Sequence, residues 1–136
     1  MSKKNFGHLR MVAESTDEES KLTIWIESGF ASFDVVIPLT EQDFHVIESD
    51  GERAAFLQAE FLQAAFHEPF QLKENNLTSE EQREYLDIIL HSPKEIVEKF
   101  LTEKDHGKAH GAISNMMRIT CGRDQNLLRS GKWFAQ

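Results

Sequence analysis

The residues best suited to chemistry lie in one short segment near the C-terminus. Asp105, His106 and His110 follow closely on one another, and Cys121 is the only cysteine of the chain. Two histidines four residues apart share one face of an α-helix, which is how a zinc-binding pair is arranged. However, a glycine follows each histidine, which disfavours a rigid helix, and the chain lacks the HExxH motif. We therefore predict polar turn residues here and no metal site.

Nucleophilic and acid–base catalysis are the next possibilities. Cys121 would need a positioned base to act as a nucleophile, and a lone cysteine is more often a small buried apolar residue. Histidines next to carboxylates, as in Asp43 with His45 and His67 with Glu68, have the residue types for proton transfer. We interpret His67 as the partner of a helix dipole at its C-terminal end. The sequence thus predicts no catalytic residue and no bound cofactor.

Charge is the strongest signal in the sequence. The net charge is −8, and residues 104–136 carry six Lys and Arg against two Asp, a balance of +4, so the first 103 residues carry −12. An acidic surface repels nucleic acid and attracts basic proteins. We predict that the acidic groups before and after the central strands form a protein-binding surface. The candidate contact residues are Glu14, Asp17, Glu18, Glu19, Asp43, Glu48 and Asp50.

The basic groups of the C-terminal part have two interpretations. Arg118, Arg123 and Arg129 with Trp133 and Phe134 have the composition of a nucleic-acid-binding patch. The acidic remainder of the chain argues against that function. We predict instead that the arginines neutralise acidic groups internally or lie at an interface, and that the last five residues are exposed.

The elements that must position these groups centre on residues 22–38. Apolar residues alternate with others in two runs around Gly29, which predicts an antiparallel hairpin with one buried face. Its other face carries Trp25 and Val36 among polar residues. Residues 7–15 predict a further strand. The alternating residues of the two runs are Leu22, Ile24 and Ile26, and Phe33, Val35 and Ile37.

Helical patterns follow the hairpin. Thr40 and Asp43 have the spacing of a capping box, and residues 52–68 form a broad apolar helix that His67 and Pro69 end. A polar loop at 73–78 precedes a helix to Leu90, and Ser92 with Pro93 predicts a capped start for the next one. Beyond Lys104 the pattern fits either helix or strand. The fold class is therefore α+β: a short antiparallel meander of about three strands, followed by and packed against four or so helices.

Length and composition limit the type of protein. Residues 1–136 are the size of one domain, and the apolar share of 40% supports a core. No apolar run approaches the length of a membrane span, and the N-terminus has no apolar segment typical of a signal peptide. With one cysteine there is no intrachain disulfide. We predict a cytoplasmic protein with no membrane partner.

The run IWIESGFASFDVVIPLTEQDF, residues 24–44, resembles small bacterial proteins grouped with the immunity proteins of polymorphic and contact-dependent growth-inhibition toxin systems. The similarity covers the first two-thirds of the chain, through YLDIIL, as a strand–strand–helix pattern. The resemblance implies a protein that binds a cognate toxin domain, often a nuclease, and blocks its active site or substrate path. Such toxins are commonly basic because they hold phosphate backbones.

These observations predict a bacterial immunity protein, not an enzyme, which neutralises a basic toxin domain through an acidic surface. We expect it to be a monomer or a weak homodimer. One alternative is a small metal-dependent or Cys/His hydrolase that uses Asp105, His106, His110 or Cys121. The other is a non-enzymatic scaffold or homodimer that associates through the Trp25 face.

Overall fold

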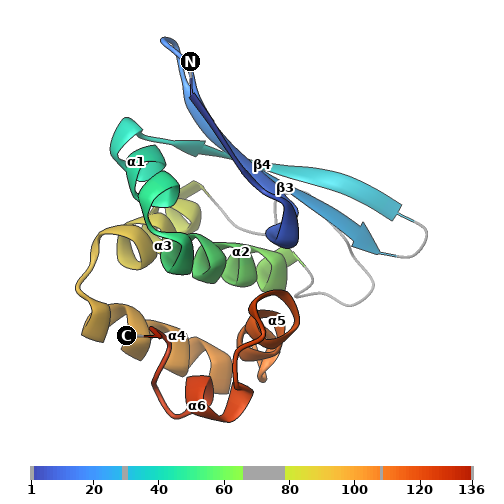
Figure 1. Cartoon of the computed structure of the whole chain (residues 1–136), viewed down its shortest axis with the longest axis vertical. Coiled ribbons are helices and arrows are strands. Elements are labelled where there is room, and N and C mark those ends of the chain that lie inside the picture. Colours follow the sequence, from blue (N-terminus) through green and yellow to red (C-terminus); the bar gives the residue numbers. More distant parts are fainter. Residues whose placement is uncertain (1, 29–30, 66–78, 108, 136) are drawn as a thin grey trace.

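The chain begins with an antiparallel meander and continues as helices (Figure 1). A computed structural model describes residues 2–28, 31–65, 79–107 and 109–135. The strands are β1 (Ser2–Phe6), β2 (Met11–Ser15), β3 (Ser20–Ser28) and β4 (Ala31–Leu39), hydrogen-bonded in that order, with the short 3-10 helix η1 (Gly7–Leu9) between β1 and β2. The helices are α1 (Glu41–Ser49), α2 (Gly51–Ala65), α3 (Ser79–His91), α4 (Lys94–His106), α5 (Ala112–Cys121) and α6 (Gln125–Arg129). The predicted α+β class is confirmed, with four strands and six α-helices in the described residues.

The hairpin predicted over residues 22–38 is the β3–β4 pair. Leu22 faces Ile37 and Ile24 faces Val35 across the two strands, and all four side chains are buried. Met11 and Ala13 of β2 extend the same buried face, as side chains two apart on a strand must. The turn at Gly29 lies outside the described residues.

The N-terminal strands differ in part from the prediction. Residues 7–9 form η1, so the strand predicted over 7–15 begins only at Met11. Strand β1 was not predicted. It is an edge strand whose first four residues are exposed, so its sequence carries no alternation of buried and exposed side chains.

The predicted capping box opens α1. Thr40 Oγ1 accepts a hydrogen bond from the Asp43 backbone N–H at 3.1 Å, and Asp43 Oδ2 accepts one from the Thr40 N–H at 2.8 Å. The helix therefore starts directly where β4 ends, because two of its free N–H groups are satisfied locally.

The helices α1 to α6 lie on one side of the sheet, and α2 passes beneath it (Figure 1). The α2 side chains of Phe56, Leu57 and Ala59 are fully buried, because this helix packs on α1, α3, α5 and β3. The broad apolar face predicted for α2 thus packs against neighbouring elements on several sides of the helix. Its predicted end at His67 and Pro69 and the predicted loop at 73–78 lie outside the described residues.

The predicted start of α4 is wrong in detail. The N-cap is Pro93, no side chain caps the helix, and α4 begins at Lys94. Ser92 does not cap because it still belongs to the end of α3: its N–H donates to the Ile88 carbonyl, and its own carbonyl accepts from Arg53 Nη1 at 2.8 Å.

The C-terminal part is helical, so the strand alternative for residues 117–121 is wrong. The chain end predicted to be exposed is buried in part: Trp133 and Phe134 retain 0% and 8% of their accessible surface, whereas Lys132 and Ala135 are exposed. Trp133 Nε1 donates to Thr102 Oγ1 at 2.8 Å, and both rings contact Phe56 edge to face. The two aromatic side chains fill the space between α2 and α4, which no local pattern encodes.

Within the described ranges, every helix is too short or too polar to cross a lipid bilayer.

Candidate functional site

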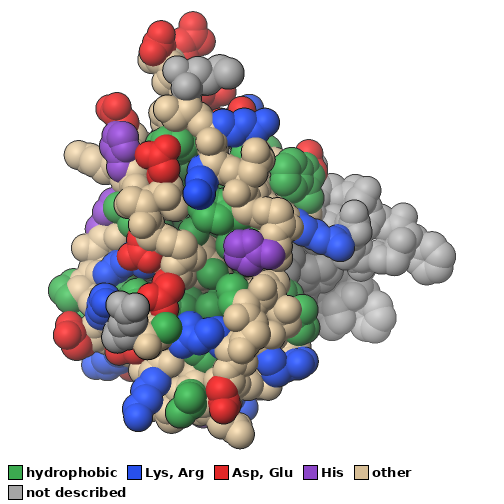
Figure 2. All heavy atoms as spheres, viewed as in Figure 1, with side chains coloured by type: hydrophobic (Ala, Val, Ile, Leu, Met, Phe, Trp, Pro, Cys, Tyr) green, Lys and Arg blue, Asp and Glu red, His purple; other side chains and the backbone are tan. Residues whose placement is uncertain are grey.

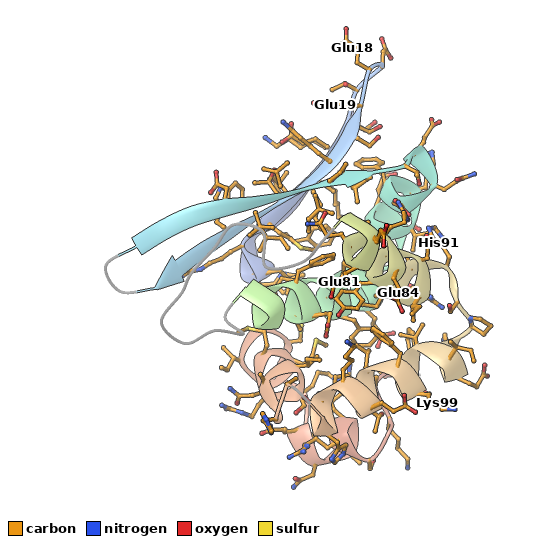
Figure 3. The ribbon with its side chains drawn as sticks, turned by 180° about the vertical axis from the view of Figure 1, so that it is seen from behind. Glu18, Glu19, Glu81, Glu84, His91 and Lys99 are labelled. Carbon is orange, nitrogen blue, oxygen red and sulfur yellow. The ribbon has the colours of Figure 1, made fainter. Side chains whose placement is uncertain are left out.

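The turn between β2 and β3 carries three of the predicted contact residues, Asp17, Glu18 and Glu19, and all three are exposed. Thr16 Oγ1 accepts hydrogen bonds from the N–H groups of Glu18 and Glu19 at 3.3 and 3.1 Å. The Thr16 N–H in turn donates to the Glu19 carbonyl at 2.8 Å. This turn stands at the end of a hairpin that projects beyond the helices (Figures 1 and 3). The carboxylates are therefore presented on an ordered turn away from the body of the molecule.

The strand register adds Glu41 to this group. Ser20 at the start of β3 pairs with Leu39 at the end of β4, so α1 begins beside the β2–β3 turn. The Glu41 side chain is 82% exposed and lies 4.0 Å from His45 Nε2. We call Asp17, Glu18, Glu19 and Glu41 the acidic end of the sheet. Figure 2 shows acidic side chains at the top of the molecular surface, where the hairpin ends.

The other predicted acids are distributed differently. Glu14 lies directly between Lys3 of β1 and Lys21 of β3, so cross-strand neighbours offset its charge. Asp50 accepts from the Arg53 N–H at 3.1 Å and forms an ion pair with Arg53 Nε at 3.1 Å. Glu48 is exposed on the last turn of α1. The seven predicted residues therefore do not form one surface.

Asp43 has to be removed from the predicted contact surface because it is fully buried. Arg83 Nη1 and Nη2 donate to its two oxygens at 2.8 Å each, and His91 Nε2 lies 2.7 Å from Oδ1. Burial alone would raise the pKa of Asp43, but hydrogen bonds from Arg83, Thr40 and His91 outweigh burial and lower the pKa to about 2. Hydrogen bonding to Asp43 raises the pKa of Arg83. The Asp43 carboxylate is charged, and the Arg83 guanidinium neutralises this charge inside the fold.

Asp43, Asp87 and His91 also form the one group in the described residues whose geometry would suit a metal ion. Their potential ligand atoms lie within 4.8 Å of one another. The Arg83 guanidinium occupies this position, with Nη2 2.8 Å from Asp43 Oδ1 and 2.7 Å from Asp87 Oδ1. A divalent cation would have to displace it. The arrangement is therefore an ion-pair network that joins α1 to α3.

Sequence reasoning missed this network. Arg83, Asp87 and His91 are spaced four residues apart and so lie on one face of α3, a signal that the sequence contains. Asp43, the partner of Arg83 and His91, is forty residues away from Arg83, and no local pattern connects the two.

The segment around His106 does not form the zinc pair considered above. His106 is the last residue of α4, whereas His110 lies in the following turn with a left-handed backbone, φ 50°. Both ring nitrogens of His106 contact Arg129: Nε2 lies 2.7 Å from its carbonyl and Nδ1 3.0 Å from Nη2. Cys121 is half-buried, with Sγ 3.4 Å from Thr120 Oγ1.

Two of the C-terminal arginines neutralise acids internally, as predicted. Arg123 Nη1 lies 3.7 Å from Glu52, and Arg129 Nε lies 3.2 Å from the buried Asp105. Arg118 is exposed and hydrogen-bonds to Asn115. Because Trp133 and Phe134 are buried, they offer no surface on which nucleic-acid bases could stack.

The face of the sheet turned away from the helices carries exposed apolar side chains. Trp25 on β3 retains 42% of its accessible surface and Val36 on β4 retains 49%. Asp34 on β4, also exposed, pairs directly with Trp25 in the strand register. We call this surface the open face of the sheet.

Comparison with known proteins adds no relatives to these features: no family model, no curated protein and no solved structure matches the chain.

Proposed function

We propose that this protein is an immunity-type inhibitor, which binds a cognate basic toxin domain of the nuclease kind and neutralises it without making or breaking a covalent bond. It would act in the bacterial cytoplasm, where a toxin delivered by contact-dependent growth inhibition reaches nucleic acid. A nuclease holds phosphate groups with Lys and Arg, so its substrate path is a surface that carboxylates can occupy in place of phosphates.

The observation that carries this proposal is the acidic end of the sheet. Its carboxylates are exposed, and the Thr16 hydrogen bonds order the turn that presents three of them. An ordered turn loses little conformational entropy on binding, so more of the interaction free energy appears as affinity. The projecting hairpin also gives the acidic side chains access to a concave active site.

Charge pairing inside the fold supports the same function. Arg83 forms ion pairs with Asp43 and Asp87. Arg123 pairs with Glu52, and Arg129 pairs with Asp105. Basic groups are thus drawn into internal ion pairs while the hairpin turn keeps its negative charge in solvent. The net charge of −8 then favours encounter with a basic protein.

The test is binding and inhibition with the purified toxin domain encoded beside the gene of this chain. The triple variant D17K/E18K/E19K should lose affinity for that domain by at least about 100-fold, since like charges would replace steering ones. It should also stop protecting nucleic acid from the domain. The matched control is E84K/E95K/E103K, which makes the same change of net charge on exposed residues of α3 and α4 and should retain most of the affinity.

Two results would contradict the proposal. One is that the neighbouring gene encodes no protein that binds the wild-type chain. The other is that the control triple variant weakens binding as much as the hairpin variant, since only total charge would then matter.

A further inference from the structure

We infer that Trp25 and Asp34 on the open face of the sheet form a receptor for one arginine or lysine side chain of the bound toxin domain. This inference rests on the proposed function and names a specific contact of the same complex.

The geometry of the pair comes from the strand register. Trp25 on β3 and Asp34 on β4 are direct cross-strand partners, and alternation with the buried Ile24 and Val35 turns both outward. Directly paired residues have Cβ atoms about 4.5–5.5 Å apart. The indole and the carboxylate therefore lie side by side on an exposed surface.

Neither side chain is occupied within the described part of the chain. Asp34 has no ion pair or side-chain hydrogen bond there, and the Trp25 ring has no stacking partner there. The Trp25 backbone N–H is satisfied by the Arg10 carbonyl at 2.9 Å. The pair thus offers a polarisable ring face and a free negative charge at the same point.

This combination suits a cationic side chain. Tryptophan is the best aromatic ring for a cation placed over its face, and arginine is the most frequent partner. A guanidinium stacked on the indole would direct its N–H groups in its own plane toward the neighbouring carboxylate, which makes a charge-assisted hydrogen bond. A basic nuclease domain supplies such side chains.

The size of the interface explains why a partner would reach this point. Stable complexes bury about 800 Å² and 20–30 residues on each side, far more than the acidic end provides. Trp25 is five residues along β3 from Ser20, which is about 17 Å at the usual rise of a strand. An interface of ordinary width that includes the hairpin turn therefore covers Trp25 if it extends along the open face.

The other surface beside the acidic end is less suited to anchor a partner. The exposed side of α1 carries Gln42, His45 and Glu48, which are polar. Tryptophan and arginine are the residue types most enriched among those that dominate binding free energy. On the open face, Glu14 lies between Lys3 and Lys21 and offsets one of their two positive charges.

The experiment compares W25A, D34N and W25A/D34N for binding of the purified toxin domain encoded beside the gene of this chain. Each single variant should weaken binding at least about tenfold, and the double variant should lose less than the product of the two losses, because both side chains hold one cation. The controls are I96A and E84Q, which remove an exposed apolar side chain and an exposed carboxylate from α4 and α3. They should bind within about twofold of wild type.

A second measurement does not depend on the toxin. N-acetyl-arginine amide should shift the indole N–H resonance of Trp25, while the buried Trp133 serves as internal reference. The neutral citrulline analogue should not shift it, and D34N should reduce the shift. Equal shifts with both compounds would overturn the inference.

Failure of this inference is distinguishable from failure of the proposed function. If D17K/E18K/E19K abolishes binding but W25A and D34N bind as wild type, the receptor is refuted and the function stands. If the toxin domain does not bind at all, the function fails. If light scattering detects a dimer that W25A dissolves, a second copy covers this face and the inference is wrong.

Discussion

Glu60 on α2 is a buried carboxyl group in the interior of the helical part, with 1% of its surface accessible. Its Oε2 has no hydrogen-bond partner among the described residues. Burial raises the pKa of Glu60 to about 7, while Lys104 opposes this shift and Asp105 adds to it. The Lys104 ammonium is directed to Tyr85 instead, 2.9 Å from its hydroxyl oxygen and 4.8 Å from its ring centroid. Glu60 therefore becomes charged near neutral pH although, in the part of the chain that the structure describes, its Oε2 has no hydrogen-bond partner.

We expect E60Q to change how stability depends on pH. Because the folded-state pKa lies above the ordinary 4.5, the contribution of Glu60 is complete below pH 4.5 and is lost as pH rises through 7. The free energies of unfolding of E60Q and wild type should agree at low pH. Above pH 7 the variant should be more stable by roughly 3–3.5 kcal/mol, the free-energy equivalent of the pKa change from 4.5 to about 7.

Urea unfolding across this pH range measures the effect. E84Q, which alters an exposed carboxylate of α3, should follow the wild-type profile. A constant difference between E60Q and wild type at all pH values would refute the assignment of this titration to Glu60.

At the scale of elements, the Asp43 network determines how α1 lies against α3. One buried carboxylate caps α1, accepts two hydrogen bonds from Arg83 and contacts His91. Because α1 also carries Glu41, this network helps to fix where the acidic end of the sheet is formed. The buried charge of Asp43 thus helps to position the exposed carboxylate of Glu41 at the acidic end of the sheet.

We expect D43N to destabilise the fold by about 3 kcal/mol at neutral pH, because it leaves a cation without its buried partner and weakens the cap. The pKa of Asp43 lies below its ordinary value of 3.8, so its contribution is present above that pH and is lost as pH falls through 2. The difference between wild type and D43N in urea unfolding should therefore shrink toward pH 2.

D87N is the matched variant for this comparison. Asp87 contacts the same arginine from an exposed position, so its loss should cost less than about 1 kcal/mol. If D43N were no more damaging than D87N, the network would not stabilise the α1–α3 contact.

In the molecule as a whole, the projecting hairpin presents acidic residues at one end. Arg83 of α3, Arg123 between α5 and α6, and Arg129 of α6 are paired with acidic side chains within the helical part. A field of this kind acts on the rate of association more than on the lifetime of a complex.

The association rate constant for the basic toxin domain should therefore fall steeply between about 0.1 M and about 1 M salt, where the Debye length shortens from about 10 Å to about 3 Å. D17K/E18K/E19K should associate slowly and with a much weaker salt dependence. Stopped-flow or surface-binding kinetics give both values. A salt dependence that is the same in the variant would place the steering charges elsewhere on the molecule.

Features that depend on neighbours along the chain could be predicted from the sequence. Alternating apolar residues specified β3 and β4, Thr40 with Asp43 specified the start of α1, and the charges of residues 17–19 specified an acidic turn. These elements could be predicted because strand alternation, capping and turn formation involve residues within a few positions of each other.

Which charges reach solvent depends on tertiary packing and could not be predicted from the sequence. Asp43 and Glu41 are both acidic residues at the start of the same predicted helix. Asp43 is nevertheless buried against Arg83, whereas Glu41 is exposed at the acidic end of the sheet. The sequence predicted an exposed chain end, yet Trp133 and Phe134 are core. Strand alternation already placed Trp25 on the face opposite the buried one, and the tertiary structure leaves this side chain 42% exposed. The physical reason is that burial depends on which distant elements pack together. That information lies in pairings such as Asp43 with Arg83 and Phe56 with Trp133, which no local pattern contains.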